Sequence, residues 1–399
     1  MTKAAQRVKL SHAENSIPSL EGKLLWLQVT IGGTLLCCMG LSWRLWTSSR
    51  LFPLIPIGDF LPPIPSLLAF VCFVVMIAFL VAAIVRPQSR GFVVAFLIAC
   101  GLLCLWDQNR WQPWLYQCFC LLLLLAIYAT KKPGLALNGA RLIVIATYFW
   151  SGLQKLNSNF IHETWPDMAG PLLRHIPYAS RTPAWLLLVI PLTEIGIAVA
   201  LTTRKFRSLA VWLAIATHAI ILITMIVSRE NVVVWPWNLA MILFVLILFR
   251  HDRETSLRQI FAPSAGQLLI LLFFGILPAL SFAGLWDSYL SSALYSGNTE
   301  QAVVYVSPAV IERLPASIRP HIWQNSQPFF LDVNRWSYGD LNVPLYPEPR
   351  VYRRVTEDIC RYAAGDSHDV RLRIKQRPNL LTGIRKSDYY DCDHLDGQE

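Results

Sequence analysis

The chain has 399 residues, of which 54% are hydrophobic and only 15% are charged, and its formal net charge is +10. A soluble domain carries about 25% charged residues, so this chain lacks the polar surface that a protein of its length needs in water. Its basic excess lies mostly in short loops beside apolar runs, where it sets membrane orientation, and nucleic-acid binding is not expected. The composition predicts an integral membrane protein, in which about 20 apolar residues carry each helix across the bilayer.

The apolar residues gather into segments of helical length. The polar residues 1–23 contain no cleavable signal peptide, so the first apolar run is expected to stay as an anchor. Apolar runs then cover about residues 24–46, 64–85, 91–106, 112–129, 140–156, 182–203, 207–227, 234–250 and 265–287. Residues 24–287 are therefore predicted to form an all-α bundle of about nine transmembrane helices.

The loops between these segments predict an orientation. If the segments alternate in direction, every basic cluster falls on one side of the membrane: Lys3, Arg7, Lys9, Lys23, Arg86, Arg90, Lys131, Lys132, Arg141, Arg204, Lys205, Arg207, Arg250, Arg253 and Arg258. Basic loops stay in the cytoplasm. Residues 1–23 are therefore expected to be cytoplasmic, and the polar residues 288–399 to form an extracytoplasmic domain.

The opposite loops hold tryptophans and polar groups. Asp107–Tyr116, at the start of the fourth segment, includes Trp111 and Gln112. These side chains either cap the helix and anchor it at the headgroups, or line a cavity that faces outward. Trp237 lies at the same predicted level, at the start of the eighth segment.

The fifth segment carries a lysine at its outer end. On a helix, Tyr148, Gly152 and Lys155 lie close to one face. Lys155 either extends its ammonium group to the headgroups, as lysines at helix ends commonly do, or is a neutral base whose pKa is lowered by burial.

Two ionisable residues lie deeper, with Glu194 in the sixth segment and His218 in the seventh. A charge in the membrane costs about 2.5–3.5 kcal/mol on insertion scales, so each side chain should face the bundle interior and have a partner. Antiparallel neighbouring helices would place the two at similar depth, and we expect them to pair. The pair would either lock two helices together or act as a proton relay.

Residues 288–399 predict a small α+β domain. Ala302–Val306 and Val370–Ile374 have strand composition, and Arg350–Tyr362 is predicted to be a helix with Pro349 in its first turn. Cys360 and Cys392 could form a disulfide if this compartment is oxidising. The remaining cysteines lie in or beside apolar runs and are predicted to be structural, and no metal site is expected.

One segment resembles a known family. Tyr148–Phe160 contains an aromatic pair, a small residue, Gly152, Lys155-Leu and a polar turn that ends in an aromatic residue. It resembles the catalytic helix of the vitamin K-dependent gamma-carboxylase and its bacterial relatives, the HTTM membrane proteins. His218, in Thr-His-Ala, looks like the histidine of a later helix in that family. The resemblance covers about residues 107–245, and DoxX-like and MauE-like proteins share the Gly-x-x-Lys-Leu part of it.

The chain also departs from the carboxylase pattern. Gln112 stands where the carboxylase has a histidine, Asn157 and Asn159 replace an acidic turn, and the large β-rich domain is missing. The propeptide and glutamate-substrate machinery is therefore not expected. A bacterial member of the wider superfamily, in the cytoplasmic membrane, is the interpretation that the resemblance favours.

The resemblance implies a function. Lys155 would be the catalytic base, with His218 and Glu194 as further catalytic residues. Tyr148, Trp111, Gln112 and Trp237 would shape an outer-facing pocket for an apolar, quinone-like or lipid-like molecule. The alternative is a non-catalytic scaffold whose outer domain binds an envelope protein. A transporter is a weaker option, because neither duplicated halves nor paired broken helices are present in the sequence.

Overall fold

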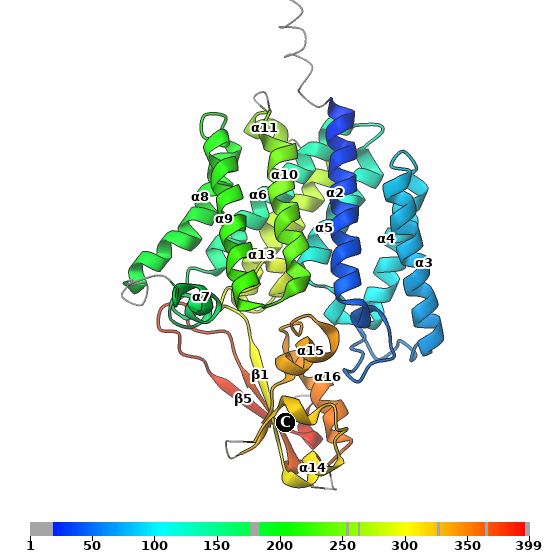
Figure 1. The fold of residues 1–399 in the computed structure, drawn as a ribbon, viewed down its shortest axis with the longest axis vertical. Helices are drawn as coiled ribbons and strands as arrows, with labels where there is room; N and C mark the ends of the chain where they lie inside the picture. The colour runs from blue at the N-terminus through cyan, green and yellow to red at the C-terminus, as the bar shows by residue number, and fades with distance from the viewer. Residues whose placement is uncertain are drawn as a thin grey trace, which may run out of the picture.

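The computed structural model describes residues 19–175, 183–252, 255–261, 264–324, 328–363 and 366–395. The predicted cytoplasmic residues 1–18 and Arg253 lie outside these ranges. Within them, a helical bundle carries a smaller domain with a β-sheet at one end, as Figure 1 shows.

Each predicted apolar segment is helical in the described part of the chain. The main helices are α2 (Leu20–Leu41), α3 (Ser66–Val85), α4 (Arg90–Trp106), α5 (Pro113–Tyr128), α6 (Pro133–Gln154), α8 (Val189–Thr202), α9 (Arg207–Ser228) and α10 (Trp235–Phe249). The last segment is continuous helix through α12 (Ala265–Ile270), the π-helix η7 (Leu271–Ile276), α13 (Leu277–Leu280) and η8 (Ser281–Ala283). Pro113 and Pro133 start α5 and α6, where a missing backbone N–H costs nothing.

Short helices connect or extend these elements. They are η1 (Trp43–Trp46), η2 (Gln108–Arg110), η3 (Phe160–Thr164), α7 (Trp165–Leu173), η5 (Ala184–Leu188), η6 (Val232–Val234), α11 (Leu257–Ile260) and η9 (Tyr289–Ser291). Helix α6 begins at Pro133, well before the predicted residue 140, because Asn138 and Arg141 interrupt the apolar run without interrupting the helix.

Six helical stretches within the described ranges are long and apolar enough to cross a membrane: Leu20–Leu41, Ser66–Val85, Ala184–Thr202, Arg207–Ser228, Val232–Phe249 and Ala265–Ala283. Many of their large apolar side chains are exposed, such as Leu67 (73%) and Leu209 (57%), which suits lipid and not water. These helices indicate an integral membrane protein. Helices α4 and α5 are shorter, with 17 and 16 residues, so the total of nine crossings stays a prediction.

The start of α9 and the helix α11 lie at the end of the bundle opposite the sheet domain (Figure 1). There Arg141 and Arg207 both approach the Asp252 carboxylate, with N–O distances of 3.0 and 3.6 Å. Arg207 also donates to the Asp252 carbonyl over 2.8 Å. The predicted clustering of basic residues at one end is therefore seen for those in the described ranges.

The second domain is built on a five-stranded antiparallel sheet with the strand order β2-β3-β1-β4-β5. The strands are β1 (Gln301–Val306), β2 (Ile322–Trp323), β3 (Phe330–Leu331), β4 (Val370–Lys375) and β5 (Ser387–Asp391), with helices α14 (Pro308–Arg313), α15 (Val333–Leu341) and α16 (Pro349–Cys360). Val304 of β1 lies opposite Leu331 on one side and Leu372 on the other, and all three are fully buried. The predicted α+β character, the two strands and the helix with Pro349 in its first turn are confirmed.

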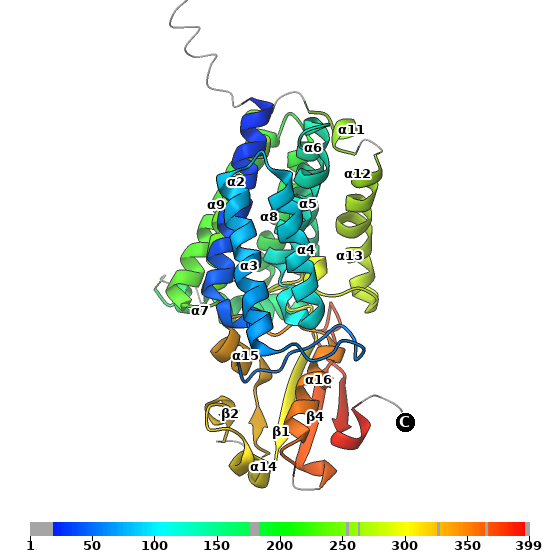
Figure 2. The same ribbon diagram turned by 90° about the vertical axis from the view of Figure 1, so that its right-hand side faces the viewer.

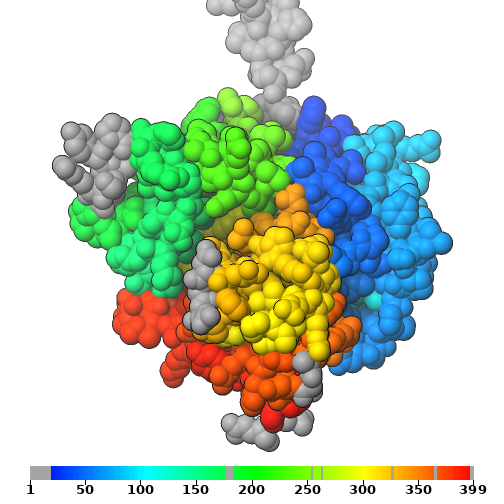
Figure 3. All heavy atoms as spheres, turned by 60° about the horizontal axis from the view of Figure 1, so that its bottom comes forward, coloured from blue at the N-terminus to red at the C-terminus, as the bar shows by residue number. Residues whose placement is uncertain are grey.

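The sheet domain lies against one end of the bundle (Figure 2). The Asp340 carboxylate of α15 accepts from the backbone N–H groups of Leu51 and Phe52, over 3.1 and 2.7 Å. Seen from its own side, the domain covers the middle of the bundle end and leaves helices visible around it (Figure 3). The bonds to Asp340 hold the loop that connects η1 to α3.

Cys360 and Cys392 form a disulfide, a question that the sequence left open. It joins the end of α16 to the residue after β5, and 32 positions separate the two cysteines. Closing a loop of this length restricts the unfolded chain, which stabilises the folded domain by about 3–4 kcal/mol.

We expect the double substitution Cys360→Ser and Cys392→Ser to lower the free energy of unfolding of the sheet domain by about 3–4 kcal/mol. Denaturant titration followed by near-ultraviolet circular dichroism measures this change. Replacing Cys37, an exposed free cysteine of α2, by serine is the control and should change little. An unchanged unfolding midpoint in the double variant would show that the bond does not stabilise the domain.

Candidate functional site

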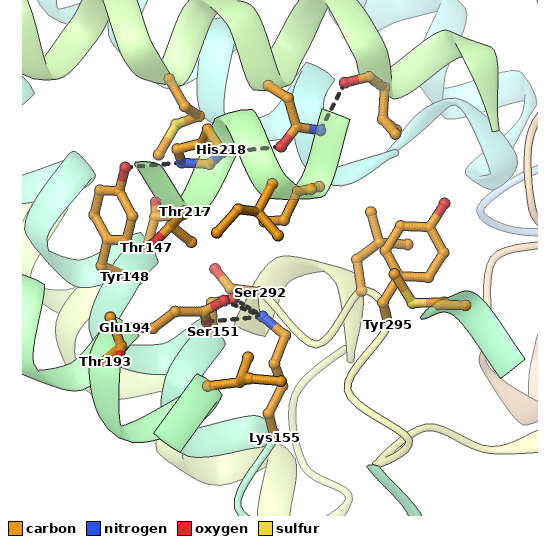
Figure 4. Close-up of a pocket in the computed structure, with 18 of the residues that line it drawn as sticks. Thr147, Tyr148, Ser151, Lys155, Thr193, Glu194, Thr217, His218, Ser292 and Tyr295 are labelled. Carbon is orange, nitrogen blue, oxygen red and sulfur yellow. Dashed lines mark hydrogen bonds and ion pairs between the residues drawn. The ribbon is translucent and has the colours of Figure 1, made fainter. Parts of the chain in front are cut away.

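A cavity of about 320 Å³ lies between α6, α8, α9 and α10. Helix α7 and the loop after η9 border it at the end of the bundle that carries the sheet domain (Figures 1 and 4). Most of its lining is apolar or aromatic, namely Pro113, Phe160, Trp165, Met168, Val189, Ile190, Ile220, Ile221, Val234, Trp237, Met241, Leu294 and Tyr295. The polar lining residues form two groups, one around Lys155 and one around His218.

Lys155, the first residue after α6, is paired with a carboxylate. Its Nζ lies 2.8 and 2.7 Å from the two oxygens of Glu194 on α8, and 2.6 Å from the hydroxyl oxygen of Ser151. Lys155 is only 9% exposed and Glu194 only 4%. A lysine ammonium has three donors, and these three acceptors use all of them. Of the two alternatives for Lys155, the structure does not show a side chain that extends to the headgroups: Lys155 turns into the bundle.

Gly152 allows α6 and α8 to approach at this point. A Cβ there would lie 2.6 Å from the carbonyl oxygen of Pro191, 2.8 Å from Cγ1 of Ile195 and 3.0 Å from Cβ of Glu194. Only a residue without a side chain fits between these atoms. The glycine therefore brings Glu194 within reach of Lys155, one turn of helix away from the close contact.

The polar turn after Lys155 is tied to the loop that leads into the sheet domain. Asn157 donates to the carbonyl oxygens of Gln154 and Ser296, both over 2.7 Å, and its own side-chain oxygen accepts from the backbone N–H of Phe160. Asn298 donates to the Gln154 side chain over 2.7 Å. Asn157 thus caps and anchors the end of α6.

His218 is held on another wall of the cavity. Its Nδ1 lies 2.9 Å from the Asn238 side-chain oxygen, and its Nε2 lies 2.8 Å from the Tyr148 hydroxyl. Asn238 donates its amide to the Val234 carbonyl, which leaves its oxygen as an acceptor. His218 Nδ1 therefore carries a proton, and Nε2 accepts the proton of Tyr148 in the neutral imidazole.

Comparison of the whole chain with known protein families, with curated proteins and with solved structures finds no match. The likeness to the vitamin K-dependent carboxylase therefore stays a prediction. What the chain does has to follow from the cavity and its side chains.

The predicted Glu194–His218 pair is not formed. Both side chains line the cavity, but Glu194 binds Lys155 and His218 binds Tyr148 and Asn238 (Figure 4). The prediction was wrong because similar depth does not fix which way each helix turns its polar residue. The separate partners create two polar groups in the cavity instead of one.

Trp237 lines the cavity as predicted, and its indole N–H donates to the Gln117 side-chain oxygen over 2.7 Å. The Gln117 amide donates in turn to the Thr147 hydroxyl over 2.9 Å. This chain of hydrogen bonds connects α10, α5 and α6 and fixes the plane of the indole ring.

Trp111 and Gln112, which were predicted to shape the same pocket, are not among the residues that line it. The Gln112 amide donates to the carbonyl oxygens of Asn109 and Pro344, each over 3.0 Å, and so fastens α5 to the sheet domain. Trp111 packs edge-on against Phe119 of α5. Of Asp107–Tyr116, only Pro113 lines the cavity, and Gln108, Asn109 and Gln112 form hydrogen bonds with the sheet domain instead.

Several site residues were missed from the sequence. Ser151 and Asn238 line the cavity and bind Lys155 and His218. A signal for both existed, because a polar side chain in an apolar helix should face the bundle interior. Ser292 and Tyr295 had no such signal, since they come from an irregular loop.

The polar groups that line the cavity are ones that can donate or accept protons. An ion pair, a hydroxyl and a neutral imidazole face an apolar volume, where hydrogen bonds and charges interact strongly. Within the described ranges, no group of three or more His, Cys, Asp or Glu side chains is placed to hold a metal ion.

Proposed function

We propose that this integral membrane protein binds a quinone-like molecule in the cavity and exchanges a proton with it through Lys155 and Glu194. The observation that carries the proposal is a buried ion pair lining an apolar cavity. Ligand sites have this character: a concave apolar volume with a few placed polar groups.

A role in ligand binding explains the buried ion pair better than a contribution to the stability of the fold. Desolvating two charges costs several kcal/mol per ion, and apolar residues of similar volume often serve the fold as well or better. Charged residues inside a membrane mark functional sites more often than structural ones.

A quinone ring matches the arrangement of polar groups. It is flat and apolar and carries two oxygens on opposite edges. The Lys155 group and the Tyr148–His218 group lie on separate walls of the cavity (Figure 4), so a ring bound between them would present one oxygen to each group. The rings of Trp165 and Trp237 suit stacking on such a plane.

With a hydroquinone bound, the proposed reaction consists of two proton transfers. The Lys155 ammonium first transfers one proton to the Glu194 carboxylate, across 2.7 Å, which leaves an amine and a carboxylic acid. The amine then takes the proton of a ligand hydroxyl and becomes an ammonium again, and the ligand becomes an anion beside it. The sum is one proton moved from the ligand to Glu194, and Lys155 is the base that the resemblance implies.

We also propose the membrane topology: nine crossings in a bacterial cytoplasmic membrane, with the first residues in the cytoplasm and the sheet domain outside. The basic residues at the far end of the bundle support this orientation. The Cys360–Cys392 disulfide supports an oxidising compartment on the side of the sheet domain. Membership of the HTTM and carboxylase superfamily is part of the same proposal.

The test is equilibrium binding of a short-chain quinone and its hydroquinone to the full chain in maltoside micelles, followed by tryptophan fluorescence. We expect saturable quenching, because Trp165 and Trp237 line the cavity. Removing both charges with Lys155→Met and Glu194→Leu should weaken hydroquinone binding at least about tenfold. The control is Lys131→Met, which removes an exposed lysine at the opposite end of the bundle and should leave binding unchanged.

The scaffold alternative predicts a different result. If the bundle only anchors a domain that binds an envelope protein, quenching will rise linearly with quinone concentration and will be equal in all variants. That outcome would overturn the proposed function.

A further inference from the structure

A second cavity, of about 410 Å³, lies where the sheet domain meets the end of the bundle. It is lined by residues of η9, β1 and α15 and by the loops beside them. Leu294 and Tyr295 line this cavity and also the first one, so the two share a wall. Gln301 and Asn334 are exposed lining residues, so the second cavity reaches the surface.

The lining of this second cavity carries only one sign of charge. It contains two carboxylates, Glu300 and Asp332, and no lysine, arginine or histidine. Asp332 already caps α15, where it accepts from the backbone N–H of Arg335 over 2.9 Å. Glu300 is therefore the carboxylate that is free to serve a ligand.

Glu300 is not satisfied within the protein. Its Oε2 is buried and has no hydrogen-bond partner. Burial, and then the nearby Glu348 carboxylate, raise the pKa of Glu300 to about 7, although Arg377 and Arg353 act in the opposite direction. A charge at this position costs free energy in the empty cavity, and a bound cation would offset that cost.

Four tyrosines, Tyr289, Tyr295, Tyr338 and Tyr352, also line this cavity. Two of their hydroxyls are already engaged: Tyr352 donates to the Glu300 carbonyl over 2.8 Å, and Tyr295 accepts from the Asn231 amide. What these side chains offer a ligand is their rings. Aromatic rings around a carboxylate are the surroundings in which proteins hold ammonium groups by cation–π attraction.

We propose that the second cavity binds an ammonium group, carried by a primary or quaternary amine, between the Glu300 carboxylate and the tyrosine rings. The site is separate from the Lys155 site and does not depend on the function proposed for it. The amine reaches the cavity either as a soluble molecule through the opening beside Asn334 or as the headgroup of a membrane lipid.

The first experiment tests whether the site requires a positive charge on the ligand. It uses the unaltered full chain, delipidated in maltoside micelles. Choline and its neutral carbon isostere have the same shape and differ only in charge. Isothermal titration calorimetry should show choline binding at least about tenfold more tightly than the isostere. Equal affinities, or binding of neither, would overturn the proposal without any variant having to fold.

The residues are tested next. Glu300→Gln should weaken choline binding about tenfold or more, whereas Glu312→Gln, which alters an exposed carboxylate of the same domain, should not change it. Tyr338→Phe keeps a ring and should retain most of the affinity, and Tyr338→Leu should lose several-fold. Full affinity in Glu300→Gln would place the bound choline elsewhere and contradict the assignment.

A competition experiment separates the two sources of the amine. A short-chain phosphatidylethanolamine that displaces choline, where the matching phosphatidylglycerol does not, identifies a lipid headgroup as a ligand. Failure of both lipids to displace choline, with ethanolamine still competing, identifies a soluble amine.

Discussion

Replacing Lys155 with methionine is expected to lower the free energy of unfolding by about 3 kcal/mol, because it leaves the Glu194 carboxylate buried without its partner. Unfolding in mixed micelles of maltoside and dodecyl sulfate, followed by circular dichroism, measures the change. A lysine that only reached the headgroups would cost less than about 1 kcal/mol when replaced.

Two further variants distinguish the effect of leaving Glu194 unpaired from the effect of removing a lysine. The double variant with Lys155→Met and Glu194→Leu removes both charges, and its stability should return to within about 1 kcal/mol of the unaltered protein. Lys131→Met should have no measurable effect, because Lys131 is exposed at the other end of the bundle. Equal stability of all these variants would contradict the buried ion pair.

Gly152→Ala is the second substitution with a large expected effect. The added Cβ would lie 2.6 Å from the backbone carbonyl oxygen of Pro191, which cannot swing aside as a side chain can. Helices α6 and α8 would have to separate, at a cost of about 2–3 kcal/mol, and Lys155 would lose its close contact with Glu194. We expect a lower free energy of unfolding together with weaker binding of the hydroquinone.

The control lies in the same helix. Gly134 is in the first turn of α6, and a Cβ there would meet no atom within 4 Å. Gly134→Ala should therefore be neutral or stabilise the helix by up to about 1 kcal/mol. If Gly152→Ala is as stable as Gly134→Ala, the tight approach of α6 and α8 is not what positions the ion pair.

The sequence predicted best those features that depend on residues close together in the chain. Apolar runs predicted where the helices lie, and two strands and the α16 helix of the second domain were also predicted. The Cys360–Cys392 bond was left open, because the sequence does not show which compartment the domain faces. The start of α6 was not, because Asn138 and Arg141 make its first turns polar although the helix is continuous. The hydropathy of a segment reflects the solvent that its side chains contact, whereas helix formation depends on backbone hydrogen bonds.

The candidate site was predicted only in part. The cost of a polar group in an apolar helix predicted that Glu194 and His218 face the interior, and both line the cavity. For Lys155 the sequence left two alternatives open. The partner of each depends on how α6, α8 and α9 are rotated about their axes, which no spacing within one helix specifies. Gln112 was misplaced because its partner, the Pro344 carbonyl, belongs to the docked sheet domain. Trp111 was misplaced because it packs against Phe119 of α5.

The most direct test of the central claim is where a quinone binds. A short-chain quinone that carries a photoreactive diazirine would be irradiated with the full chain in maltoside micelles, and the labelled peptides identified by mass spectrometry. We predict adducts in α6 and α10, at residues that line the cavity such as Met241, and their loss when excess unlabelled quinone is present. Labelling spread over lipid-facing helices such as α3, unchanged by the competitor, would contradict a quinone site beside Lys155 and Glu194.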